Sequence, residues 1–518
     1  MQFLKRSFPK KRVVILFISI LILGSLLRFY GLDKQSLSND ELASWARAHY
    51  SNLSKLVNVS AHADIHPPGY YILLYFVEKY IGDSELILRF PSAIAGVLAI
   101  FVIFLLGCRL YSYKEGLIAS ALMAVLWCPI YYSQEARPYS ILILLASLAT
   151  YFWISILENL KEKVKPSYFT ILGYIITAII FSYLHYFGLY LIVLQGLGAV
   201  LFFIRRRRAL VYILSIYLLI ILAYLPWLPA MWRQFFSPVT RQMGSWIPQP
   251  RTNIFNYYFQ YLEFLFNNSR VPFYRHGHLV EPYSRPLLSI VLVLYLFLLV
   301  HSLYNIWRTK GCKNRKKMLF SPSFLLILWL IVPFTFIYIE SKVGVPLLTF
   351  RNLIISLPAA YLLLSRSITQ LPLRSRSRAV VASVIVGLFL SHLQYYSKPF
   401  KYQFREAVYF IAERDHLYEN SLIIGYAWNP AYFNFYFKKK GSVRRVNVMG
   451  GSRKDIPRID KVIRRENPRY IWYIYALRRP NPKFIAFLNK NLTLIEHKKF
   501  LGAGVLLFEN KLEITNSK

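Results

Sequence analysis

Residues 31–91 read GLDKQSLSNDELASWARAHYSNLSKLVNVSAHADIHPPGYYILLYFVEKYIGDSELILRFP and lie between two strongly apolar segments. This stretch carries an acidic pair, Asp40–Glu41, and the tripeptide His66-Pro67-Pro68. The chain has only 24 acidic residues in 518, so a carboxylate pair just beyond an apolar segment needs a chemical reason. We interpret the stretch as an active-site loop at a membrane surface, around which the other candidate residues gather.

The composition is that of a membrane protein. Hydrophobic residues make up 56% of the chain, and the mean hydropathy is +0.38. Repeated apolar runs of about 18 residues or more predict several membrane-spanning helices. The net charge of +39 would suggest nucleic acid binding in a soluble chain, but many basic residues cluster in short loops between the apolar runs. We therefore expect membrane lipids, and not nucleic acid, as partners.

The apolar runs predict about 11 membrane-spanning helices. They lie near residues 13–31, 89–108, 115–133, 139–157, 168–186, 188–204, 210–230, 286–307, 322–340, 349–366 and 378–396. Basic loops between them should be cytoplasmic. This places the N-terminus in the cytoplasm and the C-terminus outside, in a multi-pass protein of the plasma (inner) membrane.

Two further apolar segments are predicted to lie along the outer membrane face. Gly69–Ile81 is too short for a crossing of about 20 residues and contains Glu78 and Lys79. If it crossed, the four arginines at 205–208 would face outward, against the topology rule. Ile254–Phe266, inside a long outer loop at 231–285, resembles another interfacial helix.

The sequence predicts two domains. Residues 1–396 form the transmembrane domain, whose first outer loop is 32–88. Residues 397–518 show alternating strand and helix patterns, which indicate a small extracytoplasmic α/β domain. Its predicted strands are 421–425, 470–475, 492–495 and 504–508, and its predicted helices are 404–414, 457–466 and 482–489.

Asp40 and Glu41 follow Ser38-Asn39, a pattern typical of a helix start. One interpretation makes Asp40 a general base, because a partly dehydrated membrane surface raises the pKa of a carboxylate toward the working range. The other is helix capping, since acidic groups stabilise the N-terminal end of a helix dipole. The two are compatible, because a cap can fix a catalytic carboxylate in place.

His66 precedes two prolines, which restrict the backbone and can start the next helix. It could contact a phosphate or orient an acceptor, and the alternative is a plain turn with a solvated His. Glu135 and Arg137 lie in a short outer turn, Ser133–Tyr139. Glu135 could face the same cavity as Asp40 and Arg137 could bind a phosphate, or the two could simply pair with each other.

Two more arginines lie at outer helix ends. Arg351 could neutralise a leaving phosphate, the task for which a guanidinium fork is best suited. The alternative for Arg351 is snorkelling to the interface, and for Arg89 we favour this interpretation over phosphate binding.

Together these pieces resemble one family. An acidic pair after the first membrane segment, an HPP motif, GDSE…LRFPSA, SQEARPYS and a late arginine at a helix end are similar to the multi-membrane glycosyltransferases of the GT-C fold. The nearest likeness is to bacterial relatives of the protein O-mannosyltransferases and of the lipid A aminoarabinose transferases, a family 39-like group. It is clearest over residues 13–160, weaker around 349–360 and only architectural beyond 397.

The resemblance implies transfer of a hexose or pentose from a polyprenyl-phosphate donor to an acceptor hydroxyl on a lipid, glycan or protein outside the cytoplasm. It implies that Asp40 is the catalytic aspartate, that His66 lies near the donor phosphate and that Arg351 is the family's late arginine. The turn departs from the pattern, since some relatives have Asp where this chain has Glu135. The candidate catalytic residues are Asp40, Glu41 and Glu135; the candidate ligands of the donor phosphate are His66, Arg137, Arg351 and Arg89.

No cofactor is required for such a transfer, because the activated donor already has a good leaving group. A divalent cation is optional, and no cluster of ligand residues in the sequence demands a metal. Three alternatives are a lipid-linked glycan polymerase or ligase, a secondary transporter and a non-catalytic membrane scaffold. A transporter would predict an internal repeat and polar groups at the membrane midplane, neither of which the sequence contains.

Overall fold

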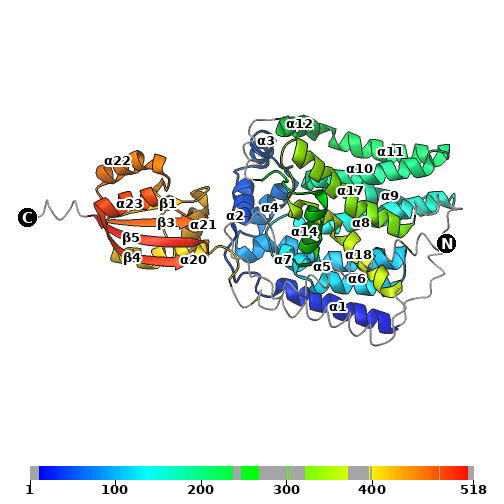
Figure 1. Ribbon diagram of the computed structural model, residues 1–518, viewed down its shortest axis with the longest axis horizontal. Helices are drawn as coiled ribbons and strands as arrows, with labels where there is room; N and C mark the ends of the chain where they lie inside the picture. Colours follow the sequence, from blue (N-terminus) through cyan, green and yellow to red (C-terminus); the bar gives the residue numbers. More distant parts are fainter. Residues whose placement is uncertain are drawn as a thin grey trace, which may run out of the picture.

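The computed structural model has two parts, a bundle of long helices and a smaller unit built on a five-stranded sheet (Figure 1). The described residues are 11–236, 247–267, 300, 304, 321–370, 396, 399–477 and 479–510. The spans predicted at 286–307 and 378–396, and parts of the loop predicted at 231–285, therefore lie outside the described residues.

Long apolar helices form most of the bundle. Within the described ranges, seven are long and apolar enough to cross a membrane, or eight if one bent pair counts as a single span. This confirms the predicted polytopic helical architecture. The seven are α1 (Lys11–Phe29), α5 (Glu85–Leu110), α8 (Tyr139–Lys161), α10 (Tyr186–Phe203), α11 (Arg207–Tyr224) with the segment that continues it to Phe236, α17 (Pro322–Val343), and η3 (Phe350–Ser356) together with α18 (Leu357–Gln370). The apolar helix α9 (Tyr168–Leu184) is shorter.

The single span predicted at 115–133 is instead broken. It consists of α6 (Tyr113–Val125) and α7 (Trp127–Ser133), whose axes differ by 58°. Leu126 between them is extended, with φ −77° and ψ 150°, and Pro129 lies in the first turn of α7. A proline at this position restricts the preceding backbone and is tolerated where the helix begins anew.

Two buried polar side chains satisfy the carbonyl groups that helix ends leave free. The Arg28 guanidinium of α1 donates to Met123 O (2.7 Å) and Ala124 O (3.1 Å) at the end of α6. In return, Gln134 Nε2, just beyond α7, donates to Leu27 O, Arg28 O and Tyr30 O at the end of α1. Lipid offers no water that could bond to these carbonyl groups. The break between α6 and α7 is therefore stabilised by the hydrogen bonds that Arg28 of α1 donates to the end of α6.

The basic loops meet at one end of the bundle. Arg109 pairs with Glu158 at 2.7 Å and Arg366 pairs with Glu115 at 2.6 Å, which ties the end of α5 to that of α8 and the end of α18 to the start of α6. Arg206 donates to Lys161 O at 3.1 Å at the same end. The shared end therefore collects the loops at 109–114, 161–165 and 205–208.

Short helices cover the opposite end of the bundle. Here lie α2 (Asn39–Ala48), α3 (Leu53–Ala63), α4 (Gly69–Tyr80) and α12 (Leu228–Phe236), with the 3₁₀ turn η1 (Leu225–Trp227) leading into α12 (Figure 1). The helix predicted at Gly69–Ile81 is thus present as α4, at 12 residues too short to span a bilayer. The other predicted interfacial helix is α14 (Ile254–Asn267), whose residues from Tyr261 to Phe266 pack into the core, all but Glu263 almost completely buried.

The C-terminal unit has a mixed sheet in the order β2-β1-β3-β5-β4. Strand β1 (Ser421–Tyr426) is parallel to β2 (Val448–Met449) and β3 (Tyr470–Ala476), whereas β5 (Ala503–Asn510) is antiparallel to β3 and β4 (Leu492–Phe500). The helices are α20 (Phe404–Arg414), α21 (Ala431–Lys439), α22 (Ile456–Glu466) and α23 (Pro482–Asn491). All predicted strands and helices are present, and β2 and α21 are additional.

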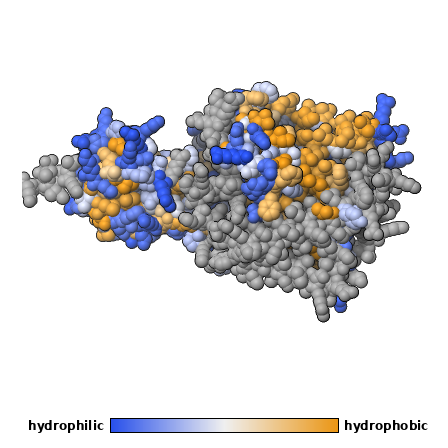
Figure 2. Space-filling model, in the orientation of Figure 1, coloured by the Kyte–Doolittle hydropathy of each residue, from blue (hydrophilic) through white to orange (hydrophobic). Residues whose placement is uncertain are grey.

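The two parts differ in the hydropathy of their surfaces. Figure 2 shows hydrophobic residues over the bundle helices on this face, and hydrophilic residues on the C-terminal unit and at the far end of the bundle. Apolar side chains on α10 and α11, such as Leu197, Leu201 and Leu218, are more than half exposed. A belt of this kind is what a lipid-facing surface requires.

Candidate functional site

The first turn of α2 carries both acidic candidates of the first loop. The Ser38 hydroxyl accepts from Glu41 N at 3.3 Å, and Glu41 Oε2 accepts from Ser38 N at 2.8 Å. This capping box confirms the predicted helix start. The two carboxylates differ in their surroundings, because Glu41 turns back over the helix start while Asp40 reaches Arg351.

Glu41 is completely enclosed. Its Oε1 accepts from Arg89 Nε (2.7 Å) and Ala136 N (2.9 Å), and its Oε2 accepts from Arg89 Nη2 (3.0 Å) and Lys401 Nζ (2.9 Å). Burial alone would raise the pKa of Glu41, but the charges of Arg89 and Lys401 hold it well below its usual range. Both oxygens are occupied by protein donors, an arrangement that suits a structural carboxylate.

Arg89 is 2% exposed, so the interpretation as a snorkelling side chain is wrong. The physical reason is Glu41, which compensates the charge inside the protein. The remaining guanidinium donors reach the carbonyl oxygens of Leu32, Gln35 and Ser36 at 2.7 to 3.0 Å. With all five N–H donors of the fork engaged, Arg89 has none directed toward a phosphate.

Glu135 belongs to the same buried group. It is 4% exposed, and burial together with the negative charge of Glu41 raises its pKa, against the opposing charge of Lys401. The alternative pairing of Glu135 with Arg137 is not formed between these two described side chains. Glu41, Glu135, Arg89 and Lys401 therefore form one cluster of two acids and two bases behind the first turn of α2, which we call the buried charge cluster.

Asp40 and Arg351 form an ion pair that joins α2 to the start of η3, 311 residues further along the chain. The pair is partly open, with 29% of the Asp40 side chain and 16% of the Arg351 side chain exposed. Burial would raise the pKa of Asp40, but Arg351 and Arg137 more than offset it and lower that pKa to about 2. The expectation of a raised pKa is thus wrong while Arg351 and Arg137 lie beside Asp40, because two cations outweigh dehydration.

Arg137 lies beside this pair. It donates to Ser44 Oγ at 2.9 Å and weakly to Asp40 O at 3.4 Å, while its Nε is buried with no partner among the described residues. Arg137 and Arg351 both lie within 6 Å of the Tyr139 ring centre, at 5.6 and 5.9 Å. Two guanidinium groups thus share one aromatic ring and a single nearby carboxylate, which leaves local positive charge for an anion.

A second acidic residue fixes His66. Asp64 Oδ1 accepts from His66 Nδ1 at 3.0 Å and from the backbone N of Ile65 at 2.6 Å, and Asp64 also pairs with Arg47 of α2. The bond to Nδ1 leaves Nε2 as the ring nitrogen free to meet a ligand. Burial and the charges of Arg137 and Arg47 lower the pKa of His66, although Asp64 opposes them.

His185 completes the group at the junction of α9 and α10. Its ring lies 5.7 Å from that of His66. Burial, together with His66, Arg137 and Arg351, lowers the pKa of His185. The structure therefore brings four segments together at the end of the bundle that faces the C-terminal unit, and we call Asp40, His66, Arg137 and Arg351 the open cluster.

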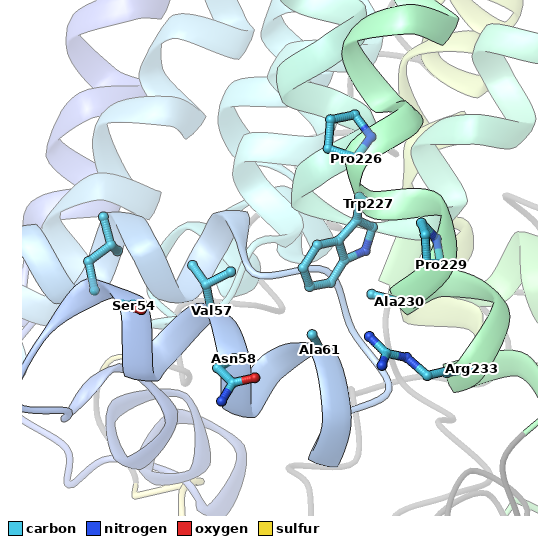
Figure 3. A pocket seen from close by; sticks show the side chains of 10 residues that line it. Ser54, Val57, Asn58, Ala61, Pro226, Trp227, Pro229, Ala230 and Arg233 are labelled. Atoms are coloured by element: carbon cyan, nitrogen blue, oxygen red, sulfur yellow. The ribbon is translucent and has the colours of Figure 1, made fainter.

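A cavity of about 670 Å³ lies next to the open cluster, between α3 and the segment from η1 to α12 (Figure 3). Its walls combine apolar groups such as Val57 and Trp227 with Asn58 and Arg233. Arg233 also approaches His62 Nε2 at 2.9 Å, in the last turn of α3 before Asp64. None of the open cluster lines this cavity, so it neighbours the candidate reaction centre without containing it.

Metal-binding geometry is not found in the part of the chain that the structure describes, where no three His, Cys, Asp or Glu side chains are grouped to hold an ion.

A model of the dolichyl-phosphate-mannose-protein mannosyltransferase family matches residues 65–232. This segment runs from just before His66 to α12 and includes Glu135 and Arg137. No curated protein matches the sequence.

Two solved structures resemble the whole chain. ArnT from Cupriavidus metallidurans, bound to undecaprenyl phosphate, superposes with a TM-score of 0.55 at 14% identity, over 96% of this chain and 98% of that one. The chain has the GT-C fold. The oligosaccharyltransferase AglB from Archaeoglobus fulgidus, in complex with an inhibitory peptide and a dolichol-phosphate, superposes with a TM-score of 0.53 at 12% identity, over 96% of this chain and 74% of that one. Related GT-C proteins thus share the arrangement of both the bundle and the C-terminal unit.

Sequence reasoning misses several residues that shape this GT-C site, among them Asp64, His185 and Lys401. Asp64 offers a usable signal, since acids are scarce here and Asp-x-His places a carboxylate within reach of the ring. Lys401 offers none, because it lies 360 residues from the Glu41 carboxylate that it contacts.

Proposed function

We propose that the protein is a membrane glycosyltransferase that moves a sugar from a polyprenyl-phosphate donor to an acceptor hydroxyl. The observation that carries the proposal is the open cluster, in which one carboxylate and three cationic or titratable nitrogen groups gather at one end of the bundle. Displacement at an anomeric carbon needs a base for the nucleophile and positive charge for the departing phosphate. The GT-C fold and the family match over residues 65–232 support the same reaction class.

Asp40 acts as the general base. The acceptor oxygen forms a bond to the anomeric carbon while the bond from that carbon to the phosphate oxygen breaks. The hydroxyl proton passes to Asp40, and the polyprenyl phosphate leaves with the electron pair. Attack from the face opposite the phosphate gives inversion at the anomeric carbon.

Arg351 serves the leaving group. Arg351 pairs with Asp40, and a carboxylate whose pKa is about 2 is a weak base. A donor phosphate offers three acceptor oxygens and competes for the guanidinium. When Arg351 turns to the phosphate, the pKa of Asp40 rises, because only Arg137 and the hydrogen bond from Asn39 then oppose the effect of burial. Donor binding thereby prepares the base.

Arg137 and His66 hold the phosphate from the other side. The buried Nε of Arg137, unpartnered among the described residues, is a donor suited to a phosphate oxygen, and Nε2 of His66 becomes one when the ring is protonated. We assign no direct chemical role to Glu41, Glu135 or Arg89. We assign all three a structural role, because they are members of the buried charge cluster.

The neighbouring cavity suits the apolar part of a lipid-linked substrate. It joins apolar walls to the single cation Arg233, a combination that fits an amphiphile. We place the site on the extracytoplasmic side of the plasma (inner) membrane, with the N-terminus in the cytoplasm, because the basic loops meet at the opposite end of the bundle. The acceptor is a lipid, a glycan or a protein hydroxyl.

The test is donor consumption by the purified protein. It is incubated with a panel of polyprenyl-phosphate hexoses and pentoses and with candidate acceptors. Wild-type protein should consume one donor, and Asp40→Asn should slow transfer by about 10³-fold while remaining folded. Asp33→Asn is the matched control, since Asp33 lies in the same loop with its side chain exposed. Equal rates in the Asp40 and Asp33 variants would refute Asp40 as the base.

A lipid-linked glycan ligase is the second candidate, which the fold likeness to AglB favours. It shares the donor chemistry but takes a preassembled glycan. Including a lipid-linked oligosaccharide in the same panel separates the two, because a ligase would consume that donor in preference to any monosaccharide donor.

A further inference from the structure

The chain that enters the C-terminal unit crosses over the first outer loop and is bonded to it. Gln35 Oε1 accepts from the backbone N of both Phe400 and Lys401 at 3.0 Å. Ser36 Oγ donates to Tyr402 O at 2.5 Å, and Leu37 N donates to Tyr436 Oη at 2.6 Å. Three consecutive residues directly before the α2 cap are thus held by the C-terminal segment, beside which α2 lies in Figure 1.

Within this contact, the Lys401 ammonium bridges two segments of the open cluster. It is 3% exposed and donates to Glu41 Oε2 at 2.9 Å and to Gln134 O at 3.0 Å. Glu41 follows Asp40 directly, and Gln134 opens the turn that carries Arg137. One side chain from the far end of the chain therefore helps to fix the separation between the candidate base and a candidate phosphate ligand, together with the bond from Ala136 N to Glu41 Oε1.

Neutralisation of Glu41 does not by itself require Lys401. Arg89 already forms two hydrogen bonds to the Glu41 carboxylate, at 2.7 and 3.0 Å. What Arg89 lacks is a contact with the turn at 134–138; its other partners are carbonyl oxygens at 32–36. Ala136 N and Arg137 already join that turn to α2 directly, through Glu41 Oε1 and Ser44 Oγ. The distinctive contribution of Lys401 is thus to tie both segments to the C-terminal part of the chain.

We propose that Lys401 is a positioning residue for sugar transfer, which holds the Asp40 side of the site in register with the Arg137 side through Glu41 and Gln134. The C-terminal unit is then part of the catalytic apparatus and more than an acceptor-binding appendage. This inference rests on the proposed function, because it concerns the geometry of that same site. A displacement of about 1 Å in a reacting group is enough to cost about 10²-fold in rate.

The experiment compares two lysine variants of the full-length protein in nanodiscs. Lys401→Met removes the buried ammonium and keeps an unbranched side chain. Lys439→Met is the matched control, since Lys439 also ties the C-terminal unit to the bundle through an ion pair, but with Asp83, a partly exposed residue outside both α2 and the turn at 134–138. Lys401→Met should lower kcat by 10-fold or more, with the KM for the donor and the affinity for polyprenyl phosphate changed less than 2-fold. Lys439→Met should match the wild type in all three.

A simple loss of folded protein would also lower the apparent kcat and leave KM unchanged, because the molecules that remain folded bind and react as before. Rates are therefore expressed per active site, titrated with radiolabelled polyprenyl phosphate. If Lys401→Met folds poorly, Lys401→Gln places a polar but shorter side chain there, and it should recover expression while keeping the low kcat. A kcat within 2-fold of the wild type in either variant, or an equal loss in Lys439→Met, overturns the proposal.

Hydrogen exchange gives a reading that does not depend on any sugar. Lys401→Met should speed amide exchange in residues 38–44 at least 10-fold, and Lys439→Met should not. If no donor in the panel is consumed, the proposed function fails, while faster exchange confined to Lys401→Met still supports the bridge. Unchanged exchange in Lys401→Met contradicts the bridge whether or not transfer is observed.

Discussion

Asp40 and Arg351 form an ion pair, so each neutralises the charge of the other. The pKa of Asp40 is low only as long as the guanidinium remains beside it. A carboxylate whose pKa is held down stabilises the fold above its ordinary pKa and loses that contribution as pH falls through its lowered pKa. The same charge balance determines when Asp40 can accept a proton.

Arg351→Gln should therefore change both the rate and its pH dependence. Loss of a donor to the leaving phosphate should slow transfer by about 10² to 10³-fold. Without Arg351 the pKa of Asp40 in the free protein rises, so the acidic limb of the kcat/KM profile should move to higher pH, since Asp40 must be unprotonated to act as base. The measurement is kcat/KM between pH 4 and 8. Arg366→Gln, which breaks the pair with Glu115 at the opposite end of the bundle, should leave the profile in place.

His66 should make phosphate binding depend on pH. Burial and the neighbouring arginines lower the pKa of His66, which favours the neutral ring near pH 7. A bound phosphate favours the charged ring, and affinity should fall as pH rises from about 5.5 to 8. His66→Gln should weaken binding of polyprenyl phosphate and flatten this slope, measured by titration across that range. His49→Gln, at an exposed His of the same loop, is the control, and an unchanged slope in His66→Gln would exclude the role.

Individual site residues were predictable where they stood in local patterns, and unpredictable where distant chain segments decided their environment. Asp40, His66, Arg137 and Arg351 were found because charged groups at apolar helix ends are rare. The buried state of Glu41 and Arg89 was not foreseeable, because it depends on Lys401 and on carbonyl groups at 32–36. The sign of the Asp40 pKa shift likewise depends on Arg351, 311 residues away.

Among the helices, the break between α6 and α7 is the feature that shapes the site most directly, because it turns the chain toward residues 134–138. Gly96 of α5 makes room for it. A Cβ at Gly96 would lie 2.1 Å from Ser133 Oγ and 2.7 Å from Arg28 Nε. These contacts involve the end of α7 and the side chain that caps α6.

Gly96→Ala should therefore destabilise the bundle and misplace the turn that carries Arg137. We expect a loss of about 1 to 3 kcal/mol in the free energy of unfolding, the usual range for overpacking a core. Gly198→Ala in α10 is the matched control, since a Cβ there would meet Trp153 at an ordinary 3.6 Å. Thermal unfolding of both variants in detergent measures the difference. Equal unfolding midpoints in the two variants would contradict the prediction, because they would show that α5 and α7 can move apart enough to accommodate the added methyl group.

The hydropathy pattern predicted the long helices well, because lipid exposure imposes it over many residues. It did not predict the break at Leu126, since the run at 115–133 stays apolar throughout and the decisive partner is Arg28 on another helix. In the C-terminal unit, β2 escaped notice because it has only two residues, Val448 and Met449, that pair with the middle of β1.

Across the whole protein, basic loops occupy one end of the bundle and the open cluster the other. Single cysteines at Lys163 and at Lys439 should therefore label from opposite sides of the membrane. We expect a membrane-impermeant maleimide added to intact cells to modify position 439 and to reach position 163 only after lysis. Modification of both positions from outside would refute the proposed topology.

The contact between Lys401 and Glu41 also constrains how the protein is made. A ribosome must add 360 residues after Glu41 before the ammonium that meets this carboxylate exists. Until then Glu41 has an incomplete set of partners, among them Arg89 and the backbone N of Ala136. A polypeptide that stalls late in synthesis should thus insert most of its helices and still lack the bridge that Lys401 provides.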